Sequence, residues 1–281
     1  MKNTRTKVAA AIAVALVLTT GGVTAAQLAN SPPVGDPPVP AVDTGEQTAG
    51  PEPSSTNCKE TFNSGAGITA FSWCFSDDGN VLKIEHSAGL EHVRIGAFTE
   101  GYCVSSNSVR HGLSLGAAGN TGLNAPTYPT SKKVVHTTTD GVWRIEQTFA
   151  QSIPTKLITI TMKFTNISGV QQNSVFVTRF IDADMSNTVG SDDWSSGSRS
   201  VAATEPGSAR LELLPTSTNF VVNNMIYPGA APVNNQFCYD PASDGTVSAS
   251  ASDRSMGVLY QLGTILPGKS KTVKYVYQVS L

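Results

Sequence analysis

The sequence is poor in charged residues, and the cations it has are scattered along the chain. Asp, Glu, Lys and Arg make up 14% of the 281 residues, against roughly 25% in an average globular protein. No run of Lys and Arg is present, and the formal charge is −2 at pH 7. Binding of DNA or RNA depends on clustered cations that neutralise phosphates. The sequence therefore argues against a nucleic-acid-binding protein.

Long apolar runs are also missing, apart from one short stretch near the N-terminus. Three cations in the first seven residues precede an uncharged stretch over residues 8–22, which ends in small side chains. Its strongly apolar part, Val8 to Leu18, is shorter than the ~20 residues that span a bilayer. This layout is typical of a secretory signal peptide, which we assign to residues 1–25. We therefore expect a secreted protein that does not insert into membranes.

Residues 26–57 have almost nothing apolar to bury and contain seven prolines among Ala, Gly, Ser, Thr and acidic residues. Such a composition predicts a semi-extended linker. Without the leader the chain has 16 Lys and Arg against 21 Asp and Glu, so its charge is −5 and gives it no attraction to anionic membranes. The remaining residues, 58–281, are long for one all-β domain but within the range of sandwiches and barrels.

Cysteine is scarce, and its number is even. The four residues are Cys58, Cys74, Cys103 and Cys238. In an exported protein an even number favours two disulfides, for which three connectivities are possible. We favour Cys58 with Cys74, which is local, and Cys103 with Cys238, which would tie distant parts of the domain together. A metal site is disfavoured because no Cys-x-x-Cys pair is present.

The domain lacks any convincing helical periodicity, and its apolar residues recur at every second position. Over residues 157–164, Ile158, Ile160, Met162 and Phe164 alternate with more polar residues, as in a half-buried strand. Residues 174–182 are apolar on both faces, as in a central strand. These patterns predict an all-β fold: an antiparallel β-sandwich, enlarged or multilayered, with long loops.

Two segments carry a family resemblance. Thr159–Gly169, with its strand followed by Asn-Ile-Ser-Gly, and Leu262–Val273, with its Pro-Gly turn, resemble the strand-and-turn signature of extracellular bacterial β-sandwich modules. Such modules are mostly non-catalytic, which is what the resemblance implies for this chain. Turn chemistry and alternation support an architecture rather than an activity.

Two Asp-Gly dipeptides predict hairpin turns, and each hairpin places a histidine on an apolar face. The turn at Asp140-Gly141 sets His136 opposite Ile145, on the face of Trp143. The turn at Asp78-Gly79 predicts one face shared by Phe71, Trp73, Phe75, Leu82, Ile84 and His86.

These histidines have two interpretations. In an enzyme, His136 or His86 would act as general acid or base with Glu91 or Glu100, beside an aromatic floor for a sugar. Alternatively, both are hydrogen-bonded histidines at the margin of the core, without chemistry. A shift of one residue in either turn would move the histidine to the other face.

The segment 182–194 concentrates acidic residues. Oxygen donors at Asp182, Asp184 and Ser186, with a carboxylate at Asp193, imitate the spacing of a calcium loop. The sixth position is Asn instead of Gly, and a solvated loop whose acids bond backbone amides is the alternative. Trp194 follows in a polar loop, where it would either fold back or contact a ligand. Other candidates for stacking on sugars are Trp73, Trp143, Tyr102, Tyr128 and Tyr227.

Three functions remain compatible with these patterns. The first is a secreted, non-catalytic β-sandwich that binds or scaffolds an extracellular polysaccharide or a cell surface, with Ca²⁺ as its only expected cofactor. The second is a carbohydrate-active enzyme, a lyase, epimerase or hydrolase, that uses the His and Glu residues named above. The third is a secreted inhibitor or toxin component, for which an exposed apolar patch would be expected.

Overall fold

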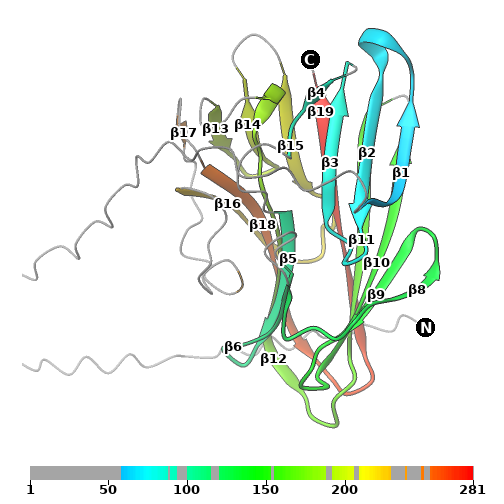
Figure 1. The fold of residues 1–281 in the computed structure, drawn as a ribbon. Helices are drawn as coiled ribbons and strands as arrows, with labels where there is room; N and C mark the ends of the chain where they lie inside the picture. Colours follow the sequence, from blue (N-terminus) through cyan, green and yellow to red (C-terminus); the bar gives the residue numbers. More distant parts are fainter. Residues whose placement is uncertain are drawn as a thin grey trace, which may run out of the picture. The chain divides into compact units, whose positions relative to one another are not determined.

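Three antiparallel sheets make up the domain (Figure 1). The computed structural model describes residues 58–87, 89–93, 100–114, 120–152, 155–187, 192–205, 209–228, 238, 248–249 and 254–280. All of them belong to one compact unit, residues 42–281. The signal peptide and the linker predicted above lie outside the described residues. No α-helix occurs in the described ranges, where the two helical segments are short 3-10 turns: η2 (Gly67–Thr69) and η4 (Met185–Asn187).

The first sheet has four strands in the order of the chain: β1 (Cys58–Ser64), β2 (Phe71–Ser76), β3 (Val81–His86) and β4 (Leu90–Glu91). The six-stranded sheet has the order β16-β18-β12-β5-β6-β7. Its strands are β5 (Glu100–Ser106), β6 (Val109–Ser114), β7 (Asn120–Thr121), β12 (Gln172–Asp182), β16 (Val221–Pro228) and β18 (Arg254–Ile265).

The nine-stranded sheet is the largest and has the order β17-β13-β14-β15-β19-β11-β10-β9-β8. Its strands are β8 (Thr127–Thr130), β9 (Lys133–Thr137), β10 (Trp143–Ser152), β11 (Leu157–Asn166), β13 (Asp193–Ser196), β14 (Val201–Thr204), β15 (Arg210–Pro215), β17 (Ser248–Ala249) and β19 (Ser270–Ser280). The predicted all-β, antiparallel sandwich is confirmed, and it is built from three sheets.

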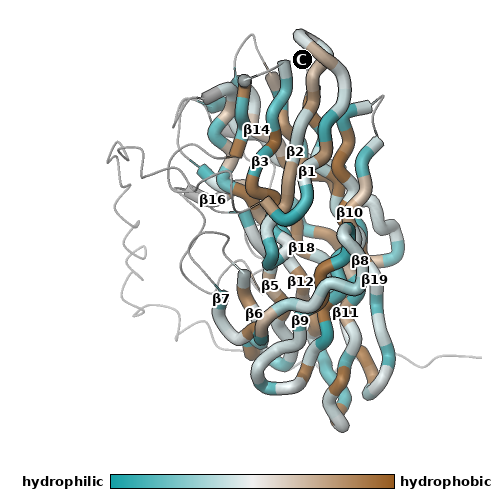
Figure 2. The backbone as a smooth tube through the Cα atoms, turned by 45° about the vertical axis from the view of Figure 1, so that its right-hand side comes forward, coloured by the Kyte–Doolittle hydropathy of each residue, from teal (hydrophilic) through white to brown (hydrophobic). Residues whose placement is uncertain are grey.

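The period-two pattern explains how the core is filled. On β11 the side chains of Ile158, Ile160, Met162 and Phe164 are all fully buried. The intervening residues face outward, so hydropathy alternates along the long strands (Figure 2). β12 lies between β18 and β5, as expected for a central strand. Its Val175 and Val177 belong to the main core, and Phe180 belongs to a second, smaller cluster.

Both predicted disulfides are present, and no cysteine among the described residues is free. Cys58–Cys74 joins β1 to β2, and Cys103–Cys238 joins β5 to a residue 135 positions further along the chain. Disulfides persist in oxidising compartments, so these two bonds indicate an extracellular or other oxidising environment. No helix in the described part of the chain is long and apolar enough to cross a membrane.

The two Asp-Gly hairpins differ in register. β9 and β10 pair as predicted, with His136 opposite Ile145. In the other hairpin, Phe71 pairs with His86 and Trp73 with Ile84. The register then shifts by one residue, so that Phe75 lies opposite Val81. Leu82 therefore does not pair with Phe75, because an irregularity between Cys74 and Phe75 interrupts the even spacing of the hairpin.

Candidate functional site

The four acid–base candidates lie at two separate places in the fold. His86 and Glu91 lie where β3 meets β4, because Glu85 pairs with Glu91 and His86 with Leu90. Glu100 and His136 lie on either side of the β2–β3 turn, inside the sandwich. The two histidines therefore lie near different carboxylates.

At the first place, His86 contacts a second histidine. The imidazoles of His86 and His92 stack with centroids 4.6 Å apart, and His86 Nδ1 contacts His92 Nε2. The backbone N–H of Ser186 in η4 donates to His92 Nδ1 over 3.1 Å. Since His92 Nδ1 accepts this bond, the proton of neutral His92 lies on Nε2 and is donated to His86. A chain of hydrogen bonds thus runs from η4 to β3.

Burial keeps both imidazoles neutral. It lowers the pKa of His92 to about 3, with a further contribution from His86. Burial also lowers the pKa of His86, and the charge of Lys156 adds to this effect. Glu91 Oε1 accepts the N–H groups of Ile84 and Val93 at 3.2 and 3.1 Å. The pair therefore connects β3 to η4.

The acidic segment of the proposed calcium loop lies next to this pair. Asp182 and Asp184 are 5% exposed, and Asp192 Oδ2 accepts the N–H of Met185 at 3.1 Å. Ser186 has a left-handed backbone, with φ of 52°. No group of three His, Cys, Asp or Glu residues is arranged to hold a metal ion within the described ranges. Part of the segment, residues 188–191, lies outside them, and the calcium clip at Asp182, Asp184, Ser186 and Asp193 stays a prediction.

At the second place, Glu100 forms a buried ion pair. Its Oε1 lies 2.6 Å from Arg179 Nε, and both side chains are fully buried. Tyr277 donates its hydroxyl to Oε1 at 2.7 Å, and the N–H of Val81 donates to Oε2 at 2.7 Å. Burial raises the pKa of Glu100 to about 7, although these partners favour its charged form. The carboxylate in turn raises the pKa of Arg179 above its usual value.

The same cluster holds the β2–β3 turn. Arg179 donates from Nη1 to Gln147 Oε1 at 2.8 Å and from Nη2 to the carbonyl of Gly79 at 3.1 Å. The carbonyl of Asp78 lies 3.2 Å from Gln147 Nε2 and 3.3 Å from His136 Nε2. His136 Nδ1 faces another carbonyl, that of Asn124, at 2.9 Å. The hydrogen bonds to the carbonyls of Asp78 and Gly79 hold the β2–β3 turn in place between the sheets.

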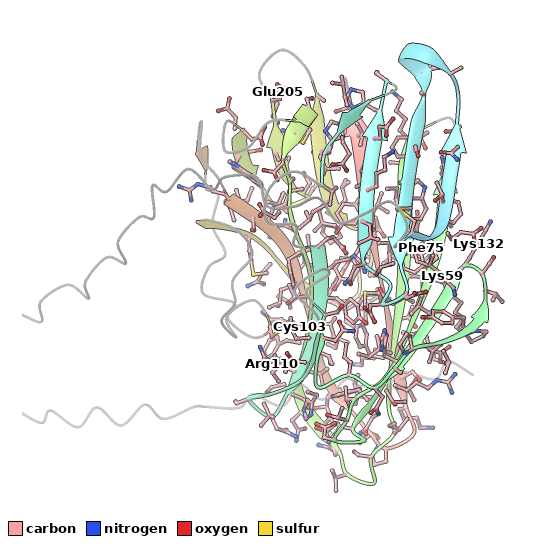
Figure 3. The ribbon with its side chains drawn as sticks, viewed as in Figure 1. Lys59, Phe75, Cys103, Arg110, Lys132 and Glu205 are labelled. Carbon is pink, nitrogen blue, oxygen red and sulfur yellow. A yellow bond between two sulfur atoms is a disulfide. The ribbon has the colours of Figure 1, made fainter. Side chains whose placement is uncertain are left out.

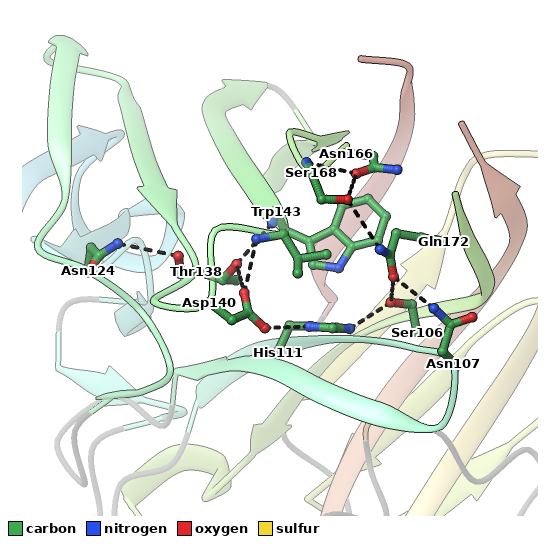
Figure 4. Close-up of polar contacts among 11 residues, drawn as sticks. Ser106, Asn107, His111, Asn124, Thr138, Asp140, Trp143, Asn166, Ser168 and Gln172 are labelled. Atoms are coloured by element: carbon green, nitrogen blue, oxygen red, sulfur yellow. Dashed lines mark hydrogen bonds and ion pairs between the residues drawn. The ribbon is translucent and has the colours of Figure 1, made fainter. Parts of the chain in front are cut away.

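A third polar cluster, which the sequence reasoning did not find, has the order of a serine-hydrolase triad (Figure 4). Asp140 Oδ2 lies 2.6 Å from His111 Nδ1, and His111 Nε2 lies 2.6 Å from Ser106 Oγ. In hydrolases this order activates the serine. Here Ser106 is fully buried, and its hydroxyl also bonds Gln172 Oε1 at 2.7 Å. The cluster connects β5, β6, β12 and the β9–β10 turn, and its serine has no open face for a substrate.

The aromatic candidates are mostly in the core. Trp73 and Trp143 are fully buried, Tyr102 likewise, and Trp194 is 2% exposed on β13. Trp194 therefore adopts the folded-back alternative. The ring of Tyr227 is outside the described side chains, which leaves Tyr128 on β8. It is 38% exposed.

Tyr128 is held by its neighbours. Lys59 Nζ lies 3.9 Å from the centroid of the Tyr128 ring and 3.4 Å from Asp77 Oδ1. Burial, then the charge and hydrogen bond of Asp77, raise the pKa of Tyr128 to about 12, so its hydroxyl stays protonated.

A second lysine and an aromatic ring lie at the same edge of the domain. Lys132 Nζ lies 5.4 Å from the ring of Phe62. Lys59 is on β1 and Lys132 is in the β8–β9 turn, so the ring contacts of these two lysines connect β1 to the β8–β9 hairpin (Figure 3). We call Lys59, Phe62, Asp77, Tyr128 and Lys132 the edge cluster.

Comparison with known proteins places the fold. No protein-family model and no curated protein matches the chain. Among solved structures, a bacterial glucoamylase in complex with acarbose is similar with a TM-score of 0.56 and 13% identity, covering 82% of this chain and 34% of the glucoamylase. At so low a sequence identity, the structural match shows a shared fold and nothing more.

Two lyases give weaker matches. A polysaccharide lyase has a TM-score of 0.44 and 13% identity over 77% of this chain and 33% of its own. A mutant of the heparan sulfate lyase HepC from Pedobacter heparinus has a TM-score of 0.46 and 8% identity over 78% and 34%. The chain spans about a third of the length of each of these three proteins.

Proposed function

We propose that this protein is an extracellular β-sandwich that binds or scaffolds polysaccharide without chemistry of its own. The observation that carries the proposal is the burial of three of the acid–base candidates: His86 and His136 are 1% exposed, and Glu100 is fully buried. A bacterial glucoamylase complexed with acarbose has a similar fold over 82% of this chain, which supports a carbohydrate as the ligand. The two disulfides fit an extracellular location.

The surroundings of the acid–base candidates support the same conclusion. A general acid or base must reach the substrate within about 3 Å, directly or through one water. Glu100 and His136 are at most 1% exposed, and both contact groups that hold the β2–β3 turn. His86 is 1% exposed and accepts from His92. These partners give the groups a structural role.

The edge cluster is the proposed sugar contact. Tyrosine combines a large apolar ring with a polar tip, and it loses little conformational entropy on binding. Tyr128 keeps 38% of its surface exposed, while Lys59 and Asp77 hold it in place. A ring fixed in this way can stack on a pyranose without first being ordered, which reduces the cost of binding.

The test is incubation of the full chain with a panel of soluble and insoluble polysaccharides, with retention and released or altered sugars measured together. We expect retention of the protein on at least one neutral or acidic polysaccharide and no change in the sugar. Formation of products would overturn the proposal and return attention to His86 and His136. Absence of both retention and products would also overturn it, in favour of a protein partner.

A further inference from the structure

We propose that the solvent face of the nine-stranded sheet is an anion-binding surface for an acidic polysaccharide, one that carries carboxylates or sulfates on successive sugars. The inference rests on the proposed function and names the class of polymer that the protein would bind. It depends on a different surface from the edge cluster, so the two can fail separately.

The solvent face follows directly from the core alternation. On β11 the buried side chains are Ile158, Ile160, Met162 and Phe164, so the residues between them point to the other side of the sheet. The pairing of β9, β10, β11 and β19 then arranges the outward residues in rows. One row is Lys133, Thr148, Thr161 and Lys274. The next rows are Val135, Glu146, Lys163 and Thr272, and then Thr137, Arg144, Thr165 and Ser270.

These rows concentrate positive charge. They contain four cations, Lys133, Arg144, Lys163 and Lys274, and one carboxylate, Glu146. Neighbouring strands are about 4.8 Å apart, so Lys133 and Lys274 mark the ends of a row roughly 14 Å long. On a chain of net negative charge, these three rows have an excess of three positive charges.

Glu146 cannot neutralise the whole face. It contacts Lys133 and lies 3.5 Å from Arg144 Nε and 3.6 Å from Lys163 Nζ. Burial opposes its charge, but Lys133, Arg144 and Lys163 together hold the pKa of Glu146 below its usual range. Three cations thus share one carboxylate. Lys274 has no acidic partner among the described residues and is exposed.

Other acids near the face are already engaged. Glu212 on β15, which pairs with Gln278 of β19, binds Arg210 Nη2 at 2.8 Å and Ser200 Oγ at 3.0 Å. The cationic rows also carry hydroxyl groups of Thr148, Thr161 and Thr165, which can donate to and accept from sugar hydroxyls.

The charge complementarity favours a polysaccharide over a nucleic acid. Proteins that hold DNA through its backbone contact about 6–10 phosphates, more than four cations with one carboxylate among them can provide. These rows lie across four neighbouring strands of a sheet, which is too broad an element to enter a groove as a helix or a two-stranded ribbon does. An extended acidic polysaccharide with spaced charges and many hydroxyls matches the mixture of lysine, arginine and threonine on these rows.

The test compares the full chain with the double variant Lys163→Gln/Lys274→Gln. Both side chains are solvent-exposed, so the fold should be unaffected. Arg110→Gln/Arg199→Gln is the charge-matched control: it removes two cations that lie away from these rows and have no acidic partner within the described ranges. The probes are a polyuronate, a sulfated polysaccharide, a neutral glucan and duplex DNA, each at several salt concentrations.

We expect the wild type and the control to bind one of the acidic polysaccharides, with an affinity that falls as salt rises. The Lys163/Lys274 variant should bind it roughly 25-fold more weakly at low salt, about fivefold for each charge near an anionic surface. Equal binding by all three proteins would overturn this inference and leave the proposed function standing. No retention of any polysaccharide would overturn both. If duplex DNA binds as tightly as the acidic polysaccharide, and the Lys163/Lys274 variant loses the same factor in affinity for DNA, the choice of an acidic polysaccharide is overturned.

Discussion

Arg179 Nε lies 2.6 Å from Glu100 Oε1 in the interior of the sandwich, and neither side chain is accessible to solvent. Both residues also bind parts of the β2–β3 turn: Arg179 donates to the carbonyl of Gly79, and Glu100 accepts from the N–H of Val81. The pair therefore fastens the four-stranded sheet to β5 and β12 of the six-stranded sheet.

Removing one member of this pair should strongly destabilise the protein. Arg179→Met leaves a buried carboxylate without its cation, and we expect a loss of about 3–5 kcal/mol in the free energy of unfolding, measured by urea denaturation. Glu100→Gln/Arg179→Met should lose less than the sum of the two single variants, because each single change strands the other partner. Additive losses would contradict the assigned coupling.

The β2–β3 turn offers a matched comparison of two glycines. Gly79 has φ of +80°, and a Cβ there would lie 2.2 Å from Gln147 Nε2, whereas Gly141 has φ of +70° and no heavy atom within 4 Å. Gly141→Ala should cost ~1–2 kcal/mol for the left-handed backbone. Gly79→Ala should cost ~1–3 kcal/mol more, because Gln147 would have to leave Asp78 and Arg179. If thermal unfolding shows equal losses of stability for the two variants, contacts with Gln147 do not hold the turn in place.

The sequence predicts contacts between residues that are close together in the chain better than it predicts contacts between distant strands. The Asp140-Gly141 dipeptide fixes the pairing of His136 with Ile145 because turn and strands are contiguous. The shift that sets Phe75 opposite Val81 was missed, since nothing in the alternation marks it. Arg179 and Glu100 meet because β12 pairs with β5, and periodicity shows which face a residue occupies but not which strand lies beside it.

The candidate site shows the same limit. The enzyme interpretation combines His86 or His136 with Glu91 or Glu100, but it did not foresee that His86 contacts His92, from a turn that periodicity does not describe. Ser106, His111 and Asp140 come from two strands and a separate turn, so their spacing in the sequence gave no signal. The disulfides could be predicted by favouring the local pair Cys58–Cys74, which leaves Cys103 and Cys238 to form the second.

The histidine pair should make the protein sensitive to acid. The folded-state pKa of His92 is lowered to about 3, below the ordinary histidine value of 6.5, so the unfolded chain binds more protons between these values. Stability should therefore fall as pH falls from about 6.5 toward 3, by about 1.4 kcal/mol for each pH unit well inside this window. His92→Asn, which keeps an acceptor for the Ser186 N–H, should show a shallower dependence of unfolding free energy on pH. An unchanged slope would contradict the burial of a neutral imidazole.

The two disulfides should contribute unequally. Cys103–Cys238 links residues 135 positions apart, and Cys58–Cys74 links residues 16 apart. If loop closure in the unfolded chain dominates, replacing the first pair by alanine should cost about 5 kcal/mol and the second about 3 kcal/mol. Denaturant titration of both double-alanine variants measures the difference, and a larger loss for Cys58–Cys74 would contradict this ranking.

The triad-like cluster should be structural. Ser106 is buried and bonded to Gln172 as well as His111, so a fluorophosphonate probe should not label it. His111→Ala should lower the free energy of unfolding by ~1–3 kcal/mol, because it leaves buried polar partners unsatisfied. Labelling of Ser106, traced by peptide mass spectrometry and abolished by His111→Ala, would assign the cluster an activity instead.

The most direct test of the central claim is a set of binding isotherms on the polysaccharide that retains the full chain best. The wild type, Tyr128→Phe and Tyr128→Ala are compared, with the soluble fraction analysed for sugar products. Binding through an ordered ring predicts near-equal affinity for the wild type and Tyr128→Phe and about tenfold weaker binding for Tyr128→Ala, equivalent to ~1.4 kcal/mol, with no products from any of them. Released sugar, or an affinity unchanged by Tyr128→Ala, would contradict non-catalytic binding at the edge cluster.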